Sequence, residues 1–219
     1  MLALTLLAVG CSRSAVYMPY DTDLVNRRGV LMLDTQGQNA LPEHLAIQEQ
    51  DRIEASLAAS PHMGPVTTRA EFSKRAAENA RLENDYTTFS DSMVTAGLGN
   101  WEQALRLSQG SKREMLLGFQ VYYLPCVGCE GGDQIAATAH MVHGPTGLLV
   151  WRATFIQPTS GEAPALEKSA REVANDVLRA FNSSMRPKWH RERFRNLSRR
   201  EGERRELQRD IVKPTGIAN

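Results

Sequence analysis

Three apolar runs joined by short connections fill the second half of the chain and constrain its fold more than any other feature. They cover residues 115–124, 135–142 and 148–156, and the turn sequence Gly-Pro-Thr-Gly at residues 144–147 joins the last two. Apolar runs of this length between turn residues are typical of strands. Because consecutive strands with short connections usually lie side by side, the sequence predicts an antiparallel meander.

Regions with other periodicities precede and follow this meander. Residues 165–181 place their apolar side chains on one helical face, which predicts an amphipathic closing helix. Residues 30–34 are a short apolar run that predicts a buried strand, and residues 66–67 predict a brief second strand. Between these two strands, residues 41–59 have the apolar spacing of a helix.

The region between residues 68 and 110 is less regular. Thr68 and Glu71 have the spacing of a capping box, which predicts that a second helix begins there. Residues 84–100 are polar and rich in Thr, Ser and Gly, so we expect a long, mobile connection. A third helix is predicted over residues 101–108, with Gly110 ending it.

The order of these elements predicts an α/β (α+β) fold, in which helices pack on a mixed, largely antiparallel sheet. The composition, 42% hydrophobic and 23% charged, supplies one core. The net charge of +1 gives no electrostatic reason to expect nucleic acid as a partner. The charge is uneven, because residues 186–210 hold 10 Lys/Arg and 5 Asp/Glu, a net +5 that leaves −4 for the remainder.

The N-terminus carries an apolar run that ends in a cysteine. Residues 1–7 are almost all apolar, and Ala-Val-Gly then leads to Cys11. This pattern resembles the lipobox of bacterial lipoproteins. The resemblance implies cleavage before Cys11 and acyl chains, palmitate among them, on its sulfur, and Ser12 implies the outer membrane as the destination. Since no Lys or Arg precedes the apolar run, an apolar N-terminus with an incidental cysteine stays open as the alternative.

This resemblance divides the chain into four expected parts. They are a signal peptide over residues 1–10, a lipidated tether over residues 11–26, an α/β periplasmic domain over residues 27–183, and a basic C-terminal helical tail over residues 184–219.

Cys126 and Cys129 form the one cysteine spacing with chemical content. If Cys11 carries lipid, an even pair remains in an oxidising compartment, which favours a disulfide within the connection between two strands. The first alternative is a thiol–disulfide oxidoreductase, although no helix is predicted there to lower the pKa of a thiol. The second is a zinc site, because Cys126, Cys129, His140 and His143 have nearly zinc-finger spacing. However, histidines three apart on a strand point to opposite faces.

The basic tail contains aromatic residues among its arginines. It could bind an acidic partner, a polymer or an anionic membrane surface, or it could be a solvated helix with weak Glu–Arg pairs such as Glu201 with Arg205. We favour the solvated helix or a partner-binding tail, with these candidate residues: Lys188, Trp189, Arg191, Arg193, Phe194 and Arg195.

Residues 142–151 carry a second resemblance. A strand, a turn ending in Thr-Gly, further apolar residues and then Trp151 resemble periplasmic lipoproteins of the curli-secretion and penicillin-binding-protein-activator type. The amino-terminal domain of TolB is similar in fold. The resemblance covers residues 27–182. The chain departs from the secretion member because it has no pair of alternating segments suited to a membrane β-hairpin, which puts pore formation in doubt.

The expected function is that of a non-enzymatic, lipid-anchored protein that faces the periplasm and serves an envelope assembly as a scaffold or accessory subunit. Envelope proteins, or further copies of the chain, are the expected partners. No cofactor, catalytic residue or nucleic-acid partner is expected.

Overall fold

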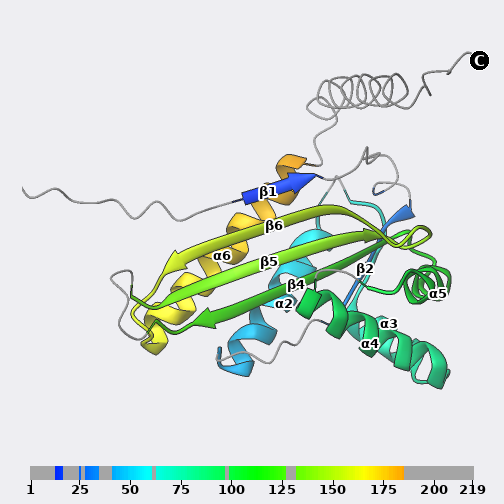
Figure 1. Cartoon of the computed structure of the whole chain (residues 1–219), viewed down its shortest axis with the longest axis horizontal. Coiled ribbons are helices and arrows are strands. Elements are labelled where there is room, and N and C mark those ends of the chain that lie inside the picture. The colour runs from blue at the N-terminus through cyan, green and yellow to red at the C-terminus, as the bar shows by residue number, and fades with distance from the viewer. Residues whose placement is uncertain are drawn as a thin grey trace, which may run out of the picture.

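A computed structural model describes residues 13–16, 25, 28–34, 41–60, 63–96, 99–126 and 132–184. Six strands form one sheet in the order β1-β6-β5-β4-β2-β3 (Figure 1). The strands are β1 (Arg13–Val16), β2 (Val30–Met32), β3 (Val66–Thr67), β4 (Met115–Leu124), β5 (Gln134–His143) and β6 (Leu148–Pro158). The helices are α2 (Glu43–Ala58), α3 (Arg69–Ala76), α4 (Ala80–Ala96), α5 (Trp101–Ser111) and α6 (Ala163–Ser184). Among these described residues, no helix has the length and apolar character needed to cross a membrane.

The central strands confirm the predicted meander. β4 pairs with β5, and β5 with β6, in antiparallel fashion along nearly their whole lengths. β2 pairs in parallel with both β3 and β4, so the sheet is mixed but mostly antiparallel. The α+β fold class predicted from the sequence is therefore confirmed.

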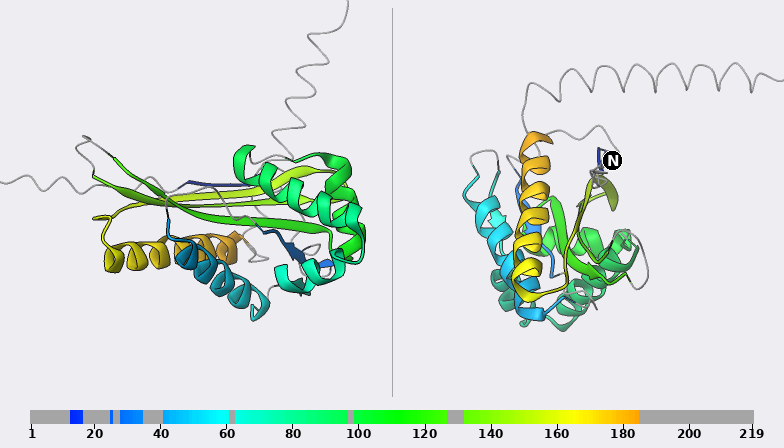
Figure 2. Two further views of the ribbon diagram at one scale, coloured as in Figure 1. Left: turned by 90° about the horizontal axis from the view of Figure 1, so that it is seen from below. Right: turned by 90° about the vertical axis from the view of Figure 1, so that its left-hand side faces the viewer.

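Apolar side chains fill two cores, one on each side of the sheet. The α2–α6 core joins those two helices to the face of β4, β5 and β6 that carries Phe119, Ala139 and Trp151. Within it, Trp151 is fully buried and meets Phe181 edge to face, with ring centroids 5.3 Å apart. The smaller α3–α5 core joins helices α3, α4 and α5 to β2 and to one end of β4 and β5. Figure 2 shows α2 and α6 on the opposite side of the sheet from α4.

Strand β2 explains how one short element serves both cores. Val30 and Met32 belong to the α2–α6 core, whereas Leu31 and Leu33 belong to the α3–α5 core. Since successive side chains of a strand point to opposite faces, a strand buried on both sides must be continuously apolar. This is the run that the sequence predicts as a buried strand.

The expected connection over residues 84–100 is wrong, because most of it is helical. α4 covers Ala80–Ala96, and its buried residues Tyr86, Phe89 and Met93 recur at helical spacing. The hydroxyl of Thr87 donates to the carbonyl of Glu83 at 3.1 Å, so this polar residue is satisfied within the helix. These three large side chains form a narrow apolar stripe, and the many Thr and Ser residues around it make its helical spacing hard to recognise in the sequence.

Two further boundaries differ from expectation. α5 continues through Gly110 and ends at Ser111, and its C-cap residue Lys112 adopts a left-handed conformation with φ 58°. A Cβ on Gly110 would lie 3.0 Å from two carbons of Leu82, so the glycine lets α4 and α5 approach closely. In addition, Arg13–Val16 lies within the expected tether but forms β1, which pairs with β6 at the edge of the sheet.

Candidate functional site

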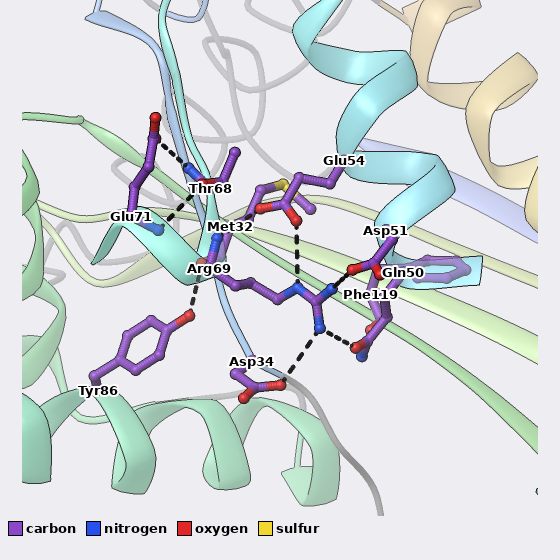
Figure 3. Close-up of polar contacts among 10 residues, drawn as sticks. All are labelled: Met32, Asp34, Gln50, Asp51, Glu54, Thr68, Arg69, Glu71, Tyr86 and Phe119. Atoms are coloured by element: carbon purple, nitrogen blue, oxygen red, sulfur yellow. Dashed lines mark hydrogen bonds and ion pairs between the residues drawn. The ribbon is translucent and has the colours of Figure 1, made fainter. Parts of the chain in front are cut away.

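A cluster of polar side chains lies where α2, α3 and the end of β2 meet, and Arg69 is at its centre (Figure 3). The predicted capping box is confirmed, since the backbone N–H of Glu71 donates to Thr68 Oγ1 at 3.2 Å and that of Thr68 donates to Glu71 Oε2 at 3.0 Å. This cap makes Arg69 the first residue of α3. Its backbone N–H donates to Glu54 Oε1 at 2.6 Å, which binds the start of α3 to α2.

The guanidinium of Arg69 contacts four side chains, which together with it form what we call the Arg69 network. Nη1 donates to Gln50 Oε1 at 2.5 Å and Nη2 donates to Asp51, while Nε lies 3.4 Å from Glu54 Oε2. Asp34, which follows β2, completes the set at 3.7 Å from Nη1. The side chain of Arg69 is only 12% exposed, so these interactions are less screened than those of a surface pair.

Two hydrogen bonds tie this region to the sheet. Gln50 Nε2 donates to the carbonyl oxygen of Phe119 on β4 at 3.1 Å. Tyr86 on α4 donates its hydroxyl to the carbonyl oxygen of Met32 at 3.0 Å. Burial raises the pKa of Tyr86 far above its usual range, and the nearby Asp34 carboxylate raises it further, so the phenol stays protonated.

A cleft of about 260 Å³ opens beside the Arg69 network, between the end of β2, α3 and α4. Oδ1 of Asp34 is buried and accepts no hydrogen bond, although it faces Arg69. Three of the seven residues that line this acidic cleft are carboxylates, and none of the seven is a His, Cys or Lys that could act as a base or nucleophile near neutral pH. Its lining residues are Asp34, Ser73, Ala76, Glu83, Tyr86, Thr87 and Asp91.

A partly buried ion pair holds α4 against α5. Arg106 donates from Nε to Asp85 Oδ2 at 2.5 Å and from Nη2 to Oδ1 at 2.9 Å. The Asp85 carboxylate is 4% exposed, and its hydrogen bond with Arg106 lowers its pKa. Neither this pair nor the Arg69 network was predicted from the sequence. The capping box marked where α3 begins, but it gave no indication of the partners of Arg69.

Cys126 of the predicted cysteine pair lies at the opposite end of the central strands from Met115. Cys126 follows β4, and its backbone N–H donates to Asp133 Oδ1 at 2.9 Å. Tyr123 also donates to Asp133, and these two hydrogen bonds lower the pKa of that carboxyl. Gly161 is packed against this group, since a Cβ there would lie 2.7 Å from Asp133 Oδ2. Cys129 lies outside the described residues, so the disulfide stays a prediction.

The geometry around Cys126 does not favour the two alternatives. In the residues that the structure describes up to Cys126, the chain reaches it from strand β4 rather than from a helix, whereas a helix N-terminus is what lowers a thiol pKa. His140 pairs with Gly118, about 20 Å of strand before Leu124. Both histidines therefore lie far from Cys126, and the described residues contain no group of three candidate metal ligands.

The two histidines have different surroundings. His140 is 8% exposed, and burial, with Arg152 nearby, lowers its pKa to about 4. His143 at the end of β5 is partly exposed, and its Nδ1 lies 2.8 Å from Thr146 Oγ1 in the turn. Cys11 and the tail residues Lys188, Trp189, Arg191, Arg193, Phe194 and Arg195 lie outside the described residues.

Comparisons with known proteins give similarities of structure only. No protein-family model and no curated protein matches the sequence. The structure is similar to the PelC dodecamer from Paraburkholderia phytofirmans at 14% identity, over 78% of this chain and 96% of that one, with a TM-score of 0.44. It is also similar to the LpoB C-terminal domain from Salmonella enterica at 14% identity, over 62% and 87%, with a TM-score of 0.41. Lipoprotein GNA1162 from Neisseria meningitidis matches at 15% identity, over 68% and 97%, with a TM-score of 0.37.

Proposed function

We propose that this chain is a non-enzymatic, lipid-anchored protein of the outer membrane that faces the periplasm and serves an envelope assembly as a scaffold or accessory subunit. The observation that carries the proposal is the apolar run ending at Cys11, which resembles a lipobox. Two residues later the chain enters β1, a strand of the folded sheet. Acyl chains on Cys11 would therefore hold the domain itself at the membrane, since several chains together give stable anchoring.

The buried charges of the domain support a structural rather than a catalytic role. Glu49, 2% exposed, pairs with Arg52, whose Nη1 also donates to Asn175 on α6 at 2.7 Å. Asp85 pairs with Arg106 between α4 and α5 in the same way. Both carboxylates are paired with an arginine that helps to join one helix to another, and the hydrogen bond from Arg106 lowers the pKa of Asp85, so that carboxylate is poorly suited to taking a proton from a substrate.

Acyl labelling in cells tests the anchor. The full chain should incorporate labelled fatty acid and fractionate with the outer membrane, and globomycin should block its processing. A Cys11→Ala variant should lose both label and membrane association, whereas the matched Cys126→Ala variant should keep its label. Label retained by the Cys11→Ala variant would contradict the proposal.

Crosslinking in the native envelope tests the accessory role. Crosslinks followed by mass spectrometry should join the domain reproducibly to particular envelope proteins or to further copies of the chain. A chain that is labelled at Cys11 but forms no reproducible crosslink would contradict the accessory role while leaving the anchor intact.

A further inference from the structure

The side of the sheet opposite α2 and α6 is covered by helices at one end only. Alternate residues of β4, β5 and β6 point to this side, and the strand register aligns them in rows across the three strands. Leu116 and Val142 form the row at the α5 end, and both are buried in the α3–α5 core. Figure 2 shows α4 over this end and no described helix over the remainder. We call that remainder the open face, and it carries Gln120, Tyr122, Thr138, Arg152, Thr154 and Ile156.

The open face is nearly free of charged side chains. β4 and β5 contain no Asp, Glu, Lys or Arg, and the one such residue of β6 is Arg152. Tyr122, Thr154 and Ile156 are partly exposed, and Leu124 at the end of β4 is 38% exposed. Protein interfaces are depleted in Lys, Glu and Asp and enriched in Tyr and Arg, so this composition is that of an interface rather than of a solvated surface.

Tyr122 lies across the middle of the open face. Its hydroxyl oxygen is 3.3 Å from Thr138 Oγ1, although the residue directly opposite Tyr122 on β5 is Ala136. The side chain therefore leans along β5, and Ala136 is fully buried. This contact holds an aromatic ring on the open face, and tyrosine is one of the residues that most often carry the binding energy of an interface.

Arg152 is a charge without a counter-ion. Its side chain is exposed and forms no hydrogen bond or ion pair with another residue in the described part of the chain. His140 lies opposite it on β5 and is uncharged near neutral pH, because burial, together with Arg152, lowers its pKa to about 4. Since the three strands themselves hold no carboxylate, a complementary partner would supply one.

The dimensions of the open face suit a single helix. From Arg152 to Pro158, β6 rises about 20 Å, which is the length of a helix of about 13 residues. Three neighbouring strands about 4.8 Å apart give a width of about 10 Å, which matches the diameter of a helix with its side chains. α6 already packs against the other side of the same strands, so the fold itself uses this arrangement.

We propose that the open face docks one amphipathic helix of a partner protein, which pairs a carboxylate with Arg152 and lays apolar side chains on Tyr122 and Ile156. This inference rests on the proposed accessory role and deepens it, because it names the surface and the chemistry of the partner. Two copies of the chain joined through their open faces would leave both Arg152 side chains without a carboxylate, so charge complementarity favours a different protein.

Photocrosslinking of the full chain in its native cell tests the surface. p-Benzoylphenylalanine introduced at Thr154 should form one defined adduct with a partner protein, whereas the same group introduced at Lys168, exposed on α6, should not form that adduct. Arg152→Glu should lower the yield of the Thr154 adduct at least about tenfold, because it places like charges in the interface. The charge-matched Arg179→Glu on α6 should change the yield less than about twofold.

Folding is checked in the same variants. Arg152 and Arg179 are both exposed, so neither change should shift the midpoint of denaturant unfolding appreciably. With equal midpoints, a lost adduct in Arg152→Glu reports lost binding rather than a lost fold.

Mass spectrometry of the Thr154 adduct tests the chemistry of the partner. The crosslinked partner peptide should contain an Asp or Glu, and a synthetic copy of that peptide should become helical by circular dichroism when the purified full-length chain is added. Changing that acidic residue to Arg in the partner should restore the adduct of the Arg152→Glu chain, since the charge pair is then re-formed in reverse.

Four results would overturn the inference. They are the same adduct from Lys168, an adduct insensitive to Arg152→Glu, a partner peptide that lacks an acidic residue or stays non-helical, and an adduct with residues 185–219 or with a second copy of the chain. Reproducible crosslinks from other surfaces with no adduct at Thr154 would overturn the docking surface but leave the accessory role intact. No crosslink from any surface would contradict the accessory role itself, so the two failures are distinguishable.

Discussion

Apolar side chains fill both cores of this domain, but the two cores differ in size and in how well the sequence pattern predicts their helices. The α2–α6 core contains Trp151 against Phe181, and apolar side chains from two long helices fill it. The α3–α5 core is smaller, and charged groups join its helices to their neighbours: Asp85 to Arg106 between α4 and α5, and Arg69 to Glu54 between α3 and α2. Apolar burial leaves a periodic trace in the sequence, whereas an ion pair between distant residues leaves none. Sequence reasoning predicts α3, α5 and β2 of the α3–α5 core, but it misses α4 and the ion pairs that join these helices to their neighbours.

The largest expected effect concerns the apolar core. Trp151→Ala should lower the free energy of unfolding by about 4 kcal/mol, because a fully buried indole leaves a cavity beside Phe181 and loses its hydrogen bond to Ser184. Denaturant unfolding measures this loss. Trp101, 55% exposed, is the matched control, and Trp101→Ala should cost less than about 1 kcal/mol. Equal losses in the two variants would mean that the α2–α6 core is not the main source of stability.

The next largest effect concerns the Arg69 network. Arg69→Met should lower the free energy of unfolding by about 3 kcal/mol, because it leaves the buried Glu54 carboxylate without its charged partner. Arg69→Lys keeps the charge but loses the planar fork that reaches Gln50 and Asp51, so it should recover only part of the loss. Full recovery by lysine would show that charge alone, rather than the geometry of the network, holds α3.

Lowering the pH should destabilise the fold through His140, which lies on the α3–α5 side of the sheet. This residue shares a face of β5 with Val142 of the α3–α5 core, and burial lowers its pKa to about 4, against 6.5 for an exposed histidine. The unfolded chain therefore binds the proton more readily, so stability falls as the pH drops from 6.5 towards 4, by about 2 kcal/mol at pH 5. His140→Gln should remove this part of the pH dependence. An unchanged pH profile in that variant would contradict the assignment.

The smallest effect is expected for an exposed ion pair on the apolar side. Arg179 of α6 pairs with Asp176 three residues earlier, but its side chain is 74% exposed. Arg179→Ala should change the free energy of unfolding by no more than about 0.5 kcal/mol, because solvent screens such pairs. Comparing this loss with that of Arg69→Met in the same unfolding experiment distinguishes a charge that links two helices from a charge that is exposed to solvent on one helix. If Arg179→Ala lowered the free energy of unfolding as much as Arg69→Met, exposed and helix-linking ion pairs would contribute equally, and the expectation would be wrong.

The part of the fold that could be predicted is the part whose apolar residues recur at a regular period, because contacts between distant residues leave no such pattern in the sequence. The three central strands, the buried β2 run and α6 were predictable because their apolar residues recur at the period of the element that they form. α4 was missed because only Tyr86, Phe89 and Met93 form its stripe, among many Thr and Ser residues. β1 was missed because Arg13–Val16 is short and polar, and its pairing with β6 comes from the distant end of the chain.

The candidate sites follow the same rule. The capping box at Thr68 and Glu71 is local, so its spacing alone predicted it. The partners of Arg69 come from residues 34, 50, 51 and 54, and no spacing within the sequence links these positions before the chain has folded. The Cys126–Cys129 disulfide, the lipid on Cys11 and the role of the tail stay predictions.

The pairing of β1 with β6 also constrains the order in which the chain can fold. A protein that crosses a membrane with its N-terminus first would present β1 long before its partner, since Thr154 lies most of the chain away from Arg13. The edge of β6 is shielded over Trp151–Thr154 only once both have arrived, and an unshielded edge is a template for aggregation. In a chain exported in this way, β1 would be among the first segments to emerge and among the last to pair, and the lipid proposed on Cys11 would hold it at the membrane until β6 arrives.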